Sequence, residues 1–241
     1  MFQPRGGGKR QAPTFDVIAP GVARHEEEIV LAPGAEPAAD PNLVLRVAVA
    51  AAEFGLPIAP GTLRNLKKCP IGDRNWTDES RELFIRLLAS GPALLNVWED
   101  IDFIDVPGKL IPEWLGVRNR PSASAAHRYT IDRHMVEVVT RLGRETPSGG
   151  RYDDRHYEAL LLAGILHDIG KRPGVANHAA EGARHATVVV ERMGFDRDIV
   201  RWVTLLVREH LTLSEFATGR NPNDPNVGDD LAGRLDHNPV L

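Results

Sequence analysis

The feature that most constrains this chain is an apolar helix-forming run that ends abruptly in ionisable residues. Residues 159–166 read Ala-Leu-Leu-Leu-Ala-Gly-Ile-Leu and are followed directly by His167 and Asp168. A segment that is apolar on every side is typical of a buried helix. Burying a carboxylate or an imidazolium without a partner is expensive, so these two residues need a compensating group. A divalent cation is such a group, because it accepts an imidazole nitrogen and a carboxylate oxygen together.

Histidines gather around this segment, since seven of the nine lie between positions 127 and 210. Histidine is the commonest metal ligand and a frequent acid or base. His134 lies on the expected helix before the apolar run, His178 begins the helix after it, and His210 lies near the end of a third. Metal sites in helical proteins are commonly gathered from several buried helices in this way. The alternative for each residue is structural, as a capped helix end or a hydrogen-bonded core histidine.

The rest of the chain predicts an all-α protein. Capping residues, Gly and Pro stop signals, and apolar residues at helical spacing delimit the elements. The first helix is expected to have Asp40 as its N-cap and Pro41 at its first position. The expected helices cover residues 41–54, 58–65, 77–90, 93–103, 130–142, 157–168, 178–193, 199–211 and 230–236.

Changes in composition divide the chain into three parts. Residues 1–39 are Gly-rich and Pro-rich and predict a flexible tail and linker, in which 14–18 and 28–31 are expected to form a β-hairpin. Residues 40–110 predict a smaller helical region without obvious chemistry. Residues 111–241 contain the histidines named above and predict the metal-binding domain.

The composition narrows the classes of function. A net charge of −4 and a pI near 6.1 argue against a protein built to hold nucleic acid through its phosphates. The single cysteine, Cys69, excludes a disulfide framework and any zinc site with two or more thiolates. No apolar run has the length of a membrane span, and the N-terminus lacks the apolar core of a secretory signal. We therefore expect a cytoplasmic protein that binds neither nucleic acid nor membrane.

The ordered set His134, His167-Asp168, His178 and His210 resembles the HD superfamily of metal-dependent phosphohydrolases, which is named after this His-Asp pair. The chain is most similar to the central, uridylyl-removing part of the bifunctional PII uridylyltransferase/uridylyl-removing enzymes. The resemblance covers roughly residues 22–227. It is carried by residues 55–60, 110–114 with 117–121, 127–134 and 206–211.

This resemblance implies an HD-type helical bundle and a hydrolase, specifically a phosphodiesterase that removes UMP or AMP from a modified tyrosine of PII. PII is a small trimeric protein of nitrogen signalling. The resemblance also implies one or two divalent ions, of Mn²⁺, Mg²⁺ or Fe²⁺. His134, His167 and Asp168 would hold the first ion with Asn221. Asp168, His178 and His210 would hold a second.

Two further residues are candidates for catalysis. Lys171 follows the His-Asp pair closely enough to reach a phosphate oxygen, the alternative being a cation at a helix C-terminus. His127 lies seven residues, or two helical turns, before His134. If that helix extends back to it, His127 lies on the same face and is a candidate acid toward the leaving tyrosinate.

The sequence also departs from the family. It has no counterpart of the nucleotidyltransferase motif, a Gly-Ser followed by paired Asp residues, or of the ACT domains, so we expect no uridylyltransferase activity from this chain. Asn221 stands where the family has its terminal Asp ligand, and an amide oxygen binds a divalent ion without supplying charge. One hypothesis is therefore that the chain is a phosphodiesterase of weakened activity. An HD phosphohydrolase of a free nucleotide and a non-catalytic binding module are the alternatives.

Other polar and aromatic residues carry weaker expectations. Arg118 and Arg120 are candidates for phosphate contacts, with a salt bridge to Glu113 as the alternative. His156 lies in a charged stretch and is expected in solvent. The four tryptophans are expected in the core.

Overall fold

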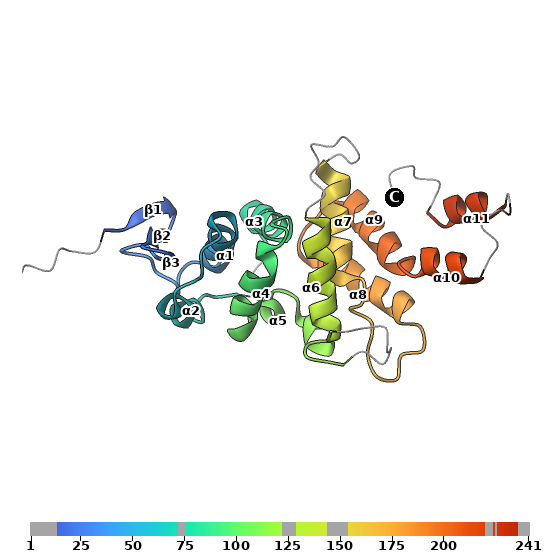
Figure 1. Ribbon diagram of the computed structural model, residues 1–241, viewed down its shortest axis with the longest axis horizontal. Coiled ribbons are helices and arrows are strands. Elements are labelled where there is room, and N and C mark those ends of the chain that lie inside the picture. The colour runs from blue at the N-terminus through green and yellow to red at the C-terminus, as the bar shows by residue number, and fades with distance from the viewer. Residues whose placement is uncertain are drawn as a thin grey trace, which may run out of the picture.

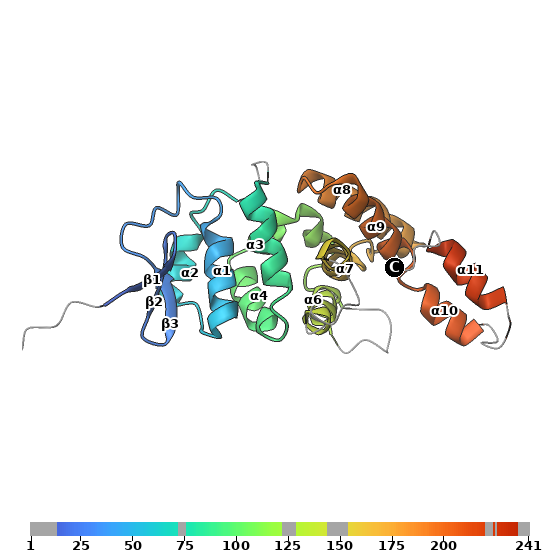
Figure 2. The same cartoon turned by 90° about the horizontal axis from the view of Figure 1, so that it is seen from above.

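The computed structural model describes residues 14–71, 76–121, 129–143, 154–219, 224 and 226–235. It is elongated, with a small sheet at one end, a layer formed by α1 to α5 beside it, the bundle α6 to α9 next, and α10 and α11 at the far end (Figures 1 and 2). The strands are β1 (Asp16–Ala19), β2 (Val22–His25) and β3 (Glu28–Leu31). The first helices are α1 (Leu43–Phe54), α2 (Pro60–Leu66), α3 (Asp78–Leu88), α4 (Ala93–Phe103) and α5 (Val106–Leu110), followed by the 3₁₀ helix η1 (Pro112–Gly116). The later helices are α6 (Ile131–Leu142), α7 (Asp154–Leu166), α8 (His178–Arg192), α9 (Arg197–Arg208), α10 (Thr212–Gly219) and α11 (Asn226–Arg234).

The expected fold class is confirmed, because helices dominate the described residues. None of these helices combines the length and the apolar character needed to cross a membrane. Thr77 caps α3 as expected, its hydroxyl accepting the Ser80 N–H at 3.1 Å. Helices α5, η1 and α10 were not predicted, because they are short segments without a clear apolar period.

The N-terminal sheet corrects the expected hairpin. β1 does not pair with β3, because β2 lies between them in an antiparallel order β1-β2-β3. Gly21 forms the first turn with a positive φ of 75°, and Glu26 takes φ 52° in the second turn. β2 has only four residues, too few to show a clear alternation, although Val22 is fully buried against the helices.

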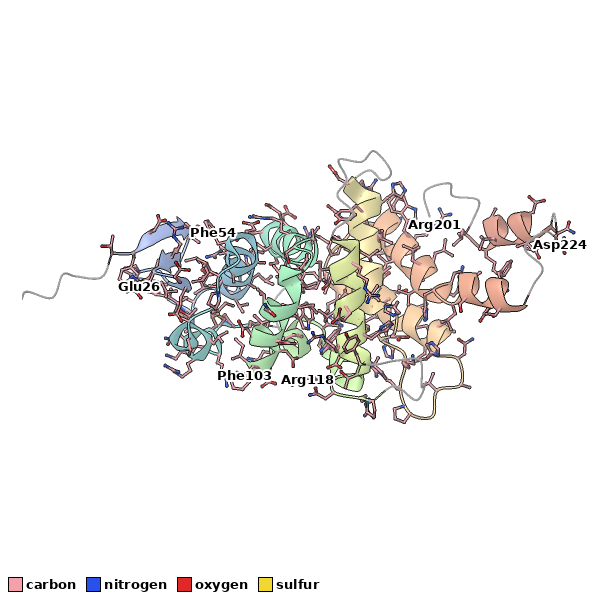
Figure 3. All side chains as sticks on the ribbon, viewed as in Figure 1. Glu26, Phe54, Phe103, Arg118, Arg201 and Asp224 are labelled. Atoms are coloured by element: carbon pink, nitrogen blue, oxygen red, sulfur yellow. The ribbon has the colours of Figure 1, made fainter. Side chains whose placement is uncertain are left out.

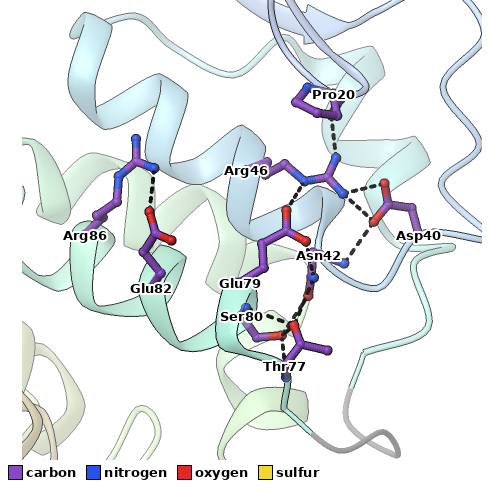
Figure 4. A network of polar contacts seen from close by, with 9 residues as sticks. All are labelled: Pro20, Asp40, Asn42, Arg46, Thr77, Glu79, Ser80, Glu82 and Arg86. Carbon is purple, nitrogen blue, oxygen red and sulfur yellow. Dashed lines mark hydrogen bonds and ion pairs between the residues drawn. The ribbon is translucent and has the colours of Figure 1, made fainter.

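An ion-pair network fixes the sheet and α3 to α1, and it changes where α1 begins (Figure 4). Arg46 pairs with Asp40 at 2.7 Å and with Glu79 at 2.8 Å, and it donates to the backbone oxygen of Pro20. The N-cap of α1 is therefore Asn42 and not Asp40 as expected. Asp40 is held by Arg46 and accepts the Asn42 N–H at 3.0 Å, so its carboxylate forms a turn just before the helix.

Helix α7 is buried on all sides from Leu161 to its end, as its apolar sequence predicts. Leu161, Leu162 and Ile165 are fully buried. α6 and α9 pack on α7, and α3 reaches it from the N-terminal layer. The helix ends at Leu166, so His167 and Asp168 emerge from the centre of the bundle.

The loop after α7 lies against the first turns of α8, and two glycines make this approach possible. A Cβ on Gly170 would lie 2.2 Å from the Gly182 nitrogen and 2.4 Å from the His178 carbonyl oxygen. Real Cβ atoms do not come so close to backbone, so Gly170 is required here. The close contact brings the start of α8, and with it His178, to the end of α7.

We predict that Gly170→Ala destabilises the fold. Because the loop and α8 must separate, we expect the free energy of unfolding to fall by about 1–3 kcal/mol. Urea unfolding followed by circular dichroism measures this change. Gly61→Ala in α2 is the control, because its Cβ meets only the end of the Arg64 side chain, at 3.7 Å. That variant should be neutral or more stable by up to about 1 kcal/mol. Equal stability of the two variants would contradict the account.

Candidate metal centre

Asp168 lies at the centre of a ring of imidazoles that comes from four places in the chain. Its side chain is only 4% exposed. The Nε2 atom of His167 lies 3.7 Å from Asp168 Oδ2, while Nε2 of His178 and of His210 lie 3.7 and 3.6 Å from Oδ1. His134 completes the ring from α6, its imidazole 5.2 Å from that of His167 between ring centroids. Ends of α7, α8 and α9 thus converge on one carboxylate.

The possible ligand atoms fall into two groups that share Asp168. His134, His167 and Asp168 form one group, and Asp168, His178 and His210 form the other. Within each group the ligand atoms lie within 4.8 Å of one another. The structure therefore brings together five of the six residues expected to hold metal. A shared carboxylate is the arrangement that would bridge two ions.

The orientation of the rings points their free nitrogens at the carboxylate. Nδ1 of His167 lies 2.8 Å from the Gly164 oxygen, and Nδ1 of His210 lies 2.7 Å from the Val207 oxygen. If each Nδ1–H donates to its carbonyl, each Nε2 carries a lone pair directed toward Asp168. Backbone carbonyls hold metal-binding histidines in this way.

The distances fit a metal ion between these atoms. Nε2 of His178 and of His210 are buried and have no hydrogen-bond partner. A lone pair that faces a carboxylate oxygen at 3.6–3.7 Å is repelled unless a cation lies between them. Two ligand atoms that are each about 2.1 Å from one ion and tetrahedrally arranged lie about 3.4 Å apart. The observed separations are close to that value.

The charge states also favour a metal. Burial lowers the pKa of His167 to about 4 despite the nearby Asp168, and burial likewise lowers the pKa of His178. For Asp168, burial acts to raise the pKa, but the His210 ring and the charges of His167 and Lys171 outweigh it and hold the pKa well below its usual range. Neutral imidazoles around an ionised carboxylate are the forms that bind a divalent ion.

Lys171 lies at the edge of this cluster. Its Nζ atom is 3.3 Å from Asp168 Oδ2, and its side chain is 23% exposed. The ammonium group therefore reaches both the carboxylate and solvent. From there it can contact an anionic group that approaches the cluster.

An apolar groove of about 430 Å³ opens onto the histidines. His134, His167 and His210 form its polar end. The walls come from α6, α7 and the segment around His210, including Val138, Leu160 and Leu206. These wall residues were not predicted from the sequence, because they follow the same helical spacing as core residues. Only their partial exposure beside the metal ligands distinguishes them.

Two expected site residues, Asn221 and His127, lie outside the described residues. The structure does bear on the helical argument for His127. Thr130 is the N-cap of α6, which begins at Ile131. The shared helical face of His127 and His134 was conditional on a helix that reaches His127, and α6 begins after that position.

Other sequence-based expectations need correction. Arg118 pairs with Asp102 at 3.0 Å and with Asp105 at 2.7 Å, not with Glu113. Glu113 instead pairs with an arginine of α8, Arg192, at 2.7 Å. Arg118 therefore pairs with carboxylates that are more distant from it in the sequence than Glu113.

His156 is also placed differently from the expectation. It stacks on the Trp202 indole with ring centroids 4.0 Å apart, so it is not simply solvated. Trp98 and Trp114 are buried as expected, and Trp76 and Trp202 are partly buried against the core.

Comparison with known proteins finds similarity to bifunctional uridylyltransferase/uridylyl-removing enzymes. No family model matches the chain. A bifunctional uridylyltransferase/uridylyl-removing enzyme of Streptomyces coelicolor is 40% identical over 228 residues, which cover 93% of this chain and 26% of the relative. The enzyme of the same name from Mycobacterium tuberculosis is 38% identical over 222 residues, covering 92% and 27%. That from Corynebacterium glutamicum is 32% identical over 195 residues, covering 80% and 27%. The chain thus spans about a quarter of the length of the curated relatives that it matches.

We predict that the metal-free protein loses stability as the pH falls from about 6.5 to about 4. The folded state holds His167 neutral with a pKa of about 4, while an unfolded chain protonates this residue near 6.5. The unfolded state therefore binds more protons in this window, and the free energy of unfolding falls by up to about 1.4 kcal/mol per pH unit for one such group. The contribution is fully present above the window. That of Asp168, whose pKa is depressed, is lost only at lower pH.

Urea unfolding at several pH values, with EDTA present, measures this dependence. His167→Gln should reduce the slope and leave the contribution of His178, whose pKa burial also lowers, whereas His185→Gln on α8 should leave the slope in place. The account fails if the free energy of unfolding does not change between pH 6.5 and 4, or if both variants keep the full slope.

Proposed function

This chain is a homologue of one part, about a quarter, of the bifunctional uridylyltransferase/uridylyl-removing enzymes, and from that premise we propose that it performs the uridylyl-removing reaction. The observation that carries the proposal is the buried Asp168, faced by the Nε2 atoms of His178 and His210, which have no hydrogen-bond partner. Such a centre suits hydrolysis of a phosphoester. The proposed substrate is a PII-type protein with UMP or AMP on a tyrosine.

The reaction cleaves the bond between the phosphorus atom and the tyrosine oxygen. Water adds its oxygen to phosphorus, one proton leaves that water, and the tyrosinate oxygen takes up a proton as it departs. A bound divalent ion supplies a water of lowered pKa and stabilises negative charge on the phosphate. His134, His167, Asp168, His178 and His210 would hold one or two such ions, with Asn221 as a further ligand.

Residues of the chain have separate roles in this scheme. Lys171, with its Nζ at the edge of the cluster, binds a non-bridging phosphate oxygen. His127, which lies outside the described residues, is the proposed donor of the proton to the tyrosinate. The apolar groove beside His134 and His167 takes the aromatic part of the substrate, because a ring packs on apolar walls without losing hydrogen bonds.

We predict that the protein releases nucleotide from modified PII. Uridylylated and adenylylated PII are each incubated with the protein and Mn²⁺, and released UMP or AMP is measured by chromatography. Release should require both the ion and Asp168, so Asp168→Ala should lower the rate by at least about a thousandfold. Asp198→Asn is the control, because this carboxylate is 61% exposed at the start of α9. Release that survives in EDTA or in Asp168→Ala would contradict the proposal.

The variant Asn221→Asp separates the alternatives. Restoring a charged ligand should raise the release rate if the chain is a weakened phosphodiesterase, while Asn65→Asp in α2 adds the same charge far from the site. Cleavage of free nucleotides without release from PII would indicate the other phosphohydrolase activity. No activity in either form, with the fold intact, would indicate a binding module.

A further inference from the structure

A second cavity, distinct from the metal centre, lies where α4 meets α6. Its volume is about 260 Å³, and residues of α4, η1 and α6 line it. α6 contributes to both sites, because Asp132 lines this cavity while His134 lines the groove of the metal centre. Figure 3 shows the labelled Arg118 near the lower end of α6, on the side of the N-terminal layer. We call this space the α4–α6 cavity.

Two buried side chains in the lining of this cavity each carry a polar atom without a hydrogen-bond partner. Asp132 is 8% exposed, and its Oδ2 accepts the Asn119 N–H at 2.8 Å, but its Oδ1 has no hydrogen-bond partner. Trp114 is 1% exposed, and its Nε1–H also has no partner. Leaving buried polar atoms unpaired is unfavourable. A group inside the cavity that donates to Asp132 and accepts from Trp114 would pair both residues.

The charges around the cavity favour a cation. Its lining holds three carboxylates, Glu99, Asp102 and Asp132, and one guanidinium, Arg133. Arg133 is engaged by Glu99 and by Glu137, its other partner on α6. Because Arg118 neutralises Asp102, the carboxylate left without a cation among the described residues is Asp132.

The arrangement of the three carboxylates in the lining of the α4–α6 cavity argues against a metal ion there. In the part of the chain that the structure describes, three or more carboxylates and histidines come within ligand distance of one another only in the two groups around Asp168. The α4–α6 cavity has instead two indoles in its lining, Trp98 and Trp114, with ring centroids 5.3 Å apart. Aromatic faces attract organic cations. The cavity is smaller than the roughly 300–1,000 Å³ of drug-sized sites, so it suits a small ligand.

We propose that the α4–α6 cavity binds a small organic ammonium ion that carries a hydroxyl or carbonyl oxygen. The ammonium group donates to Asp132 Oδ1 beside the indoles, and the oxygen accepts the Trp114 Nε1–H. This site is independent of the hydrolase proposal, since none of its residues belongs to the metal centre. A cavity filled only with water is the alternative that the experiment has to exclude.

The experiment uses the whole chain labelled with 5-fluorotryptophan and followed by ¹⁹F NMR at constant ionic strength. The four tryptophan signals are assigned with single Trp→Phe variants. The probe is 2-aminoethanol, which is protonated at neutral pH, and its isosteres are ethylene glycol and glycolate. We expect 2-aminoethanol to shift the signals of Trp98 and Trp114 with saturation, while the two isosteres leave them unchanged.

Variants test the role of the carboxylate. Asp132→Asn keeps an acceptor for the Asn119 N–H but removes the charge, so it should weaken binding by about tenfold or more. Glu158→Gln is the matched control, because Glu158 is a partly buried carboxylate in the lining of another cavity. If Asp132→Asn loses its fold, the comparison of 2-aminoethanol with its isosteres in the unchanged protein decides. The proposal is overturned if 2-aminoethanol gives no saturable shift, if ethylene glycol gives the same shift, or if Asp132→Asn binds equally well.

Discussion

The structure depends on one buried carboxylate, Asp168, and on how its charge is compensated. The end of α7, the helix that delivers it, is buried, and the Asp168 side chain is itself only 4% exposed. Lys171 pairs with it from one side only, and the remaining neighbours are imidazole nitrogens. These nitrogens become favourable partners only when a cation lies between them and the carboxylate. A metal centre thus follows from the packing of α7 as much as from the histidines themselves.

Several parts of the fold serve to bring the ligands to this carboxylate. Gly170 lets the loop after α7 lie on α8, which delivers His178. Backbone carbonyls of Gly164 and Val207 set the ring orientation of His167 and His210. The N-terminal layer supports α7 through α3, and α3 is in turn fixed to α1 by the Arg46 network. The groove beside the ligands leaves their free side open to a substrate.

Sequence reasoning predicted the features that depend on local pattern. Short stretches of sequence predict the buried helix, the Thr77 cap and the residue types that can bind a metal. The structure brings five of the expected ligands together. Features that depend on distant residues were missed. Asp40 has the sequence pattern of a helix cap, but in the structure it pairs with Arg46. Arg118 pairs with carboxylates of α4 and of the following turn and not with Glu113. Wall residues such as Leu160 look like core because only tertiary structure shows which apolar residues border a site.

The most direct test of the account is a titration of the metal-free protein with Co²⁺, followed by its visible absorption and by calorimetry. The account predicts saturable binding of one or two ions per chain, with an absorption band typical of nitrogen and oxygen ligands. Asp168→Asn should lose this binding while keeping its fold, and Asp198→Asn should retain it. Absence of binding by the unchanged protein, or equal binding by Asp168→Asn, would contradict the claim that a metal compensates the buried carboxylate.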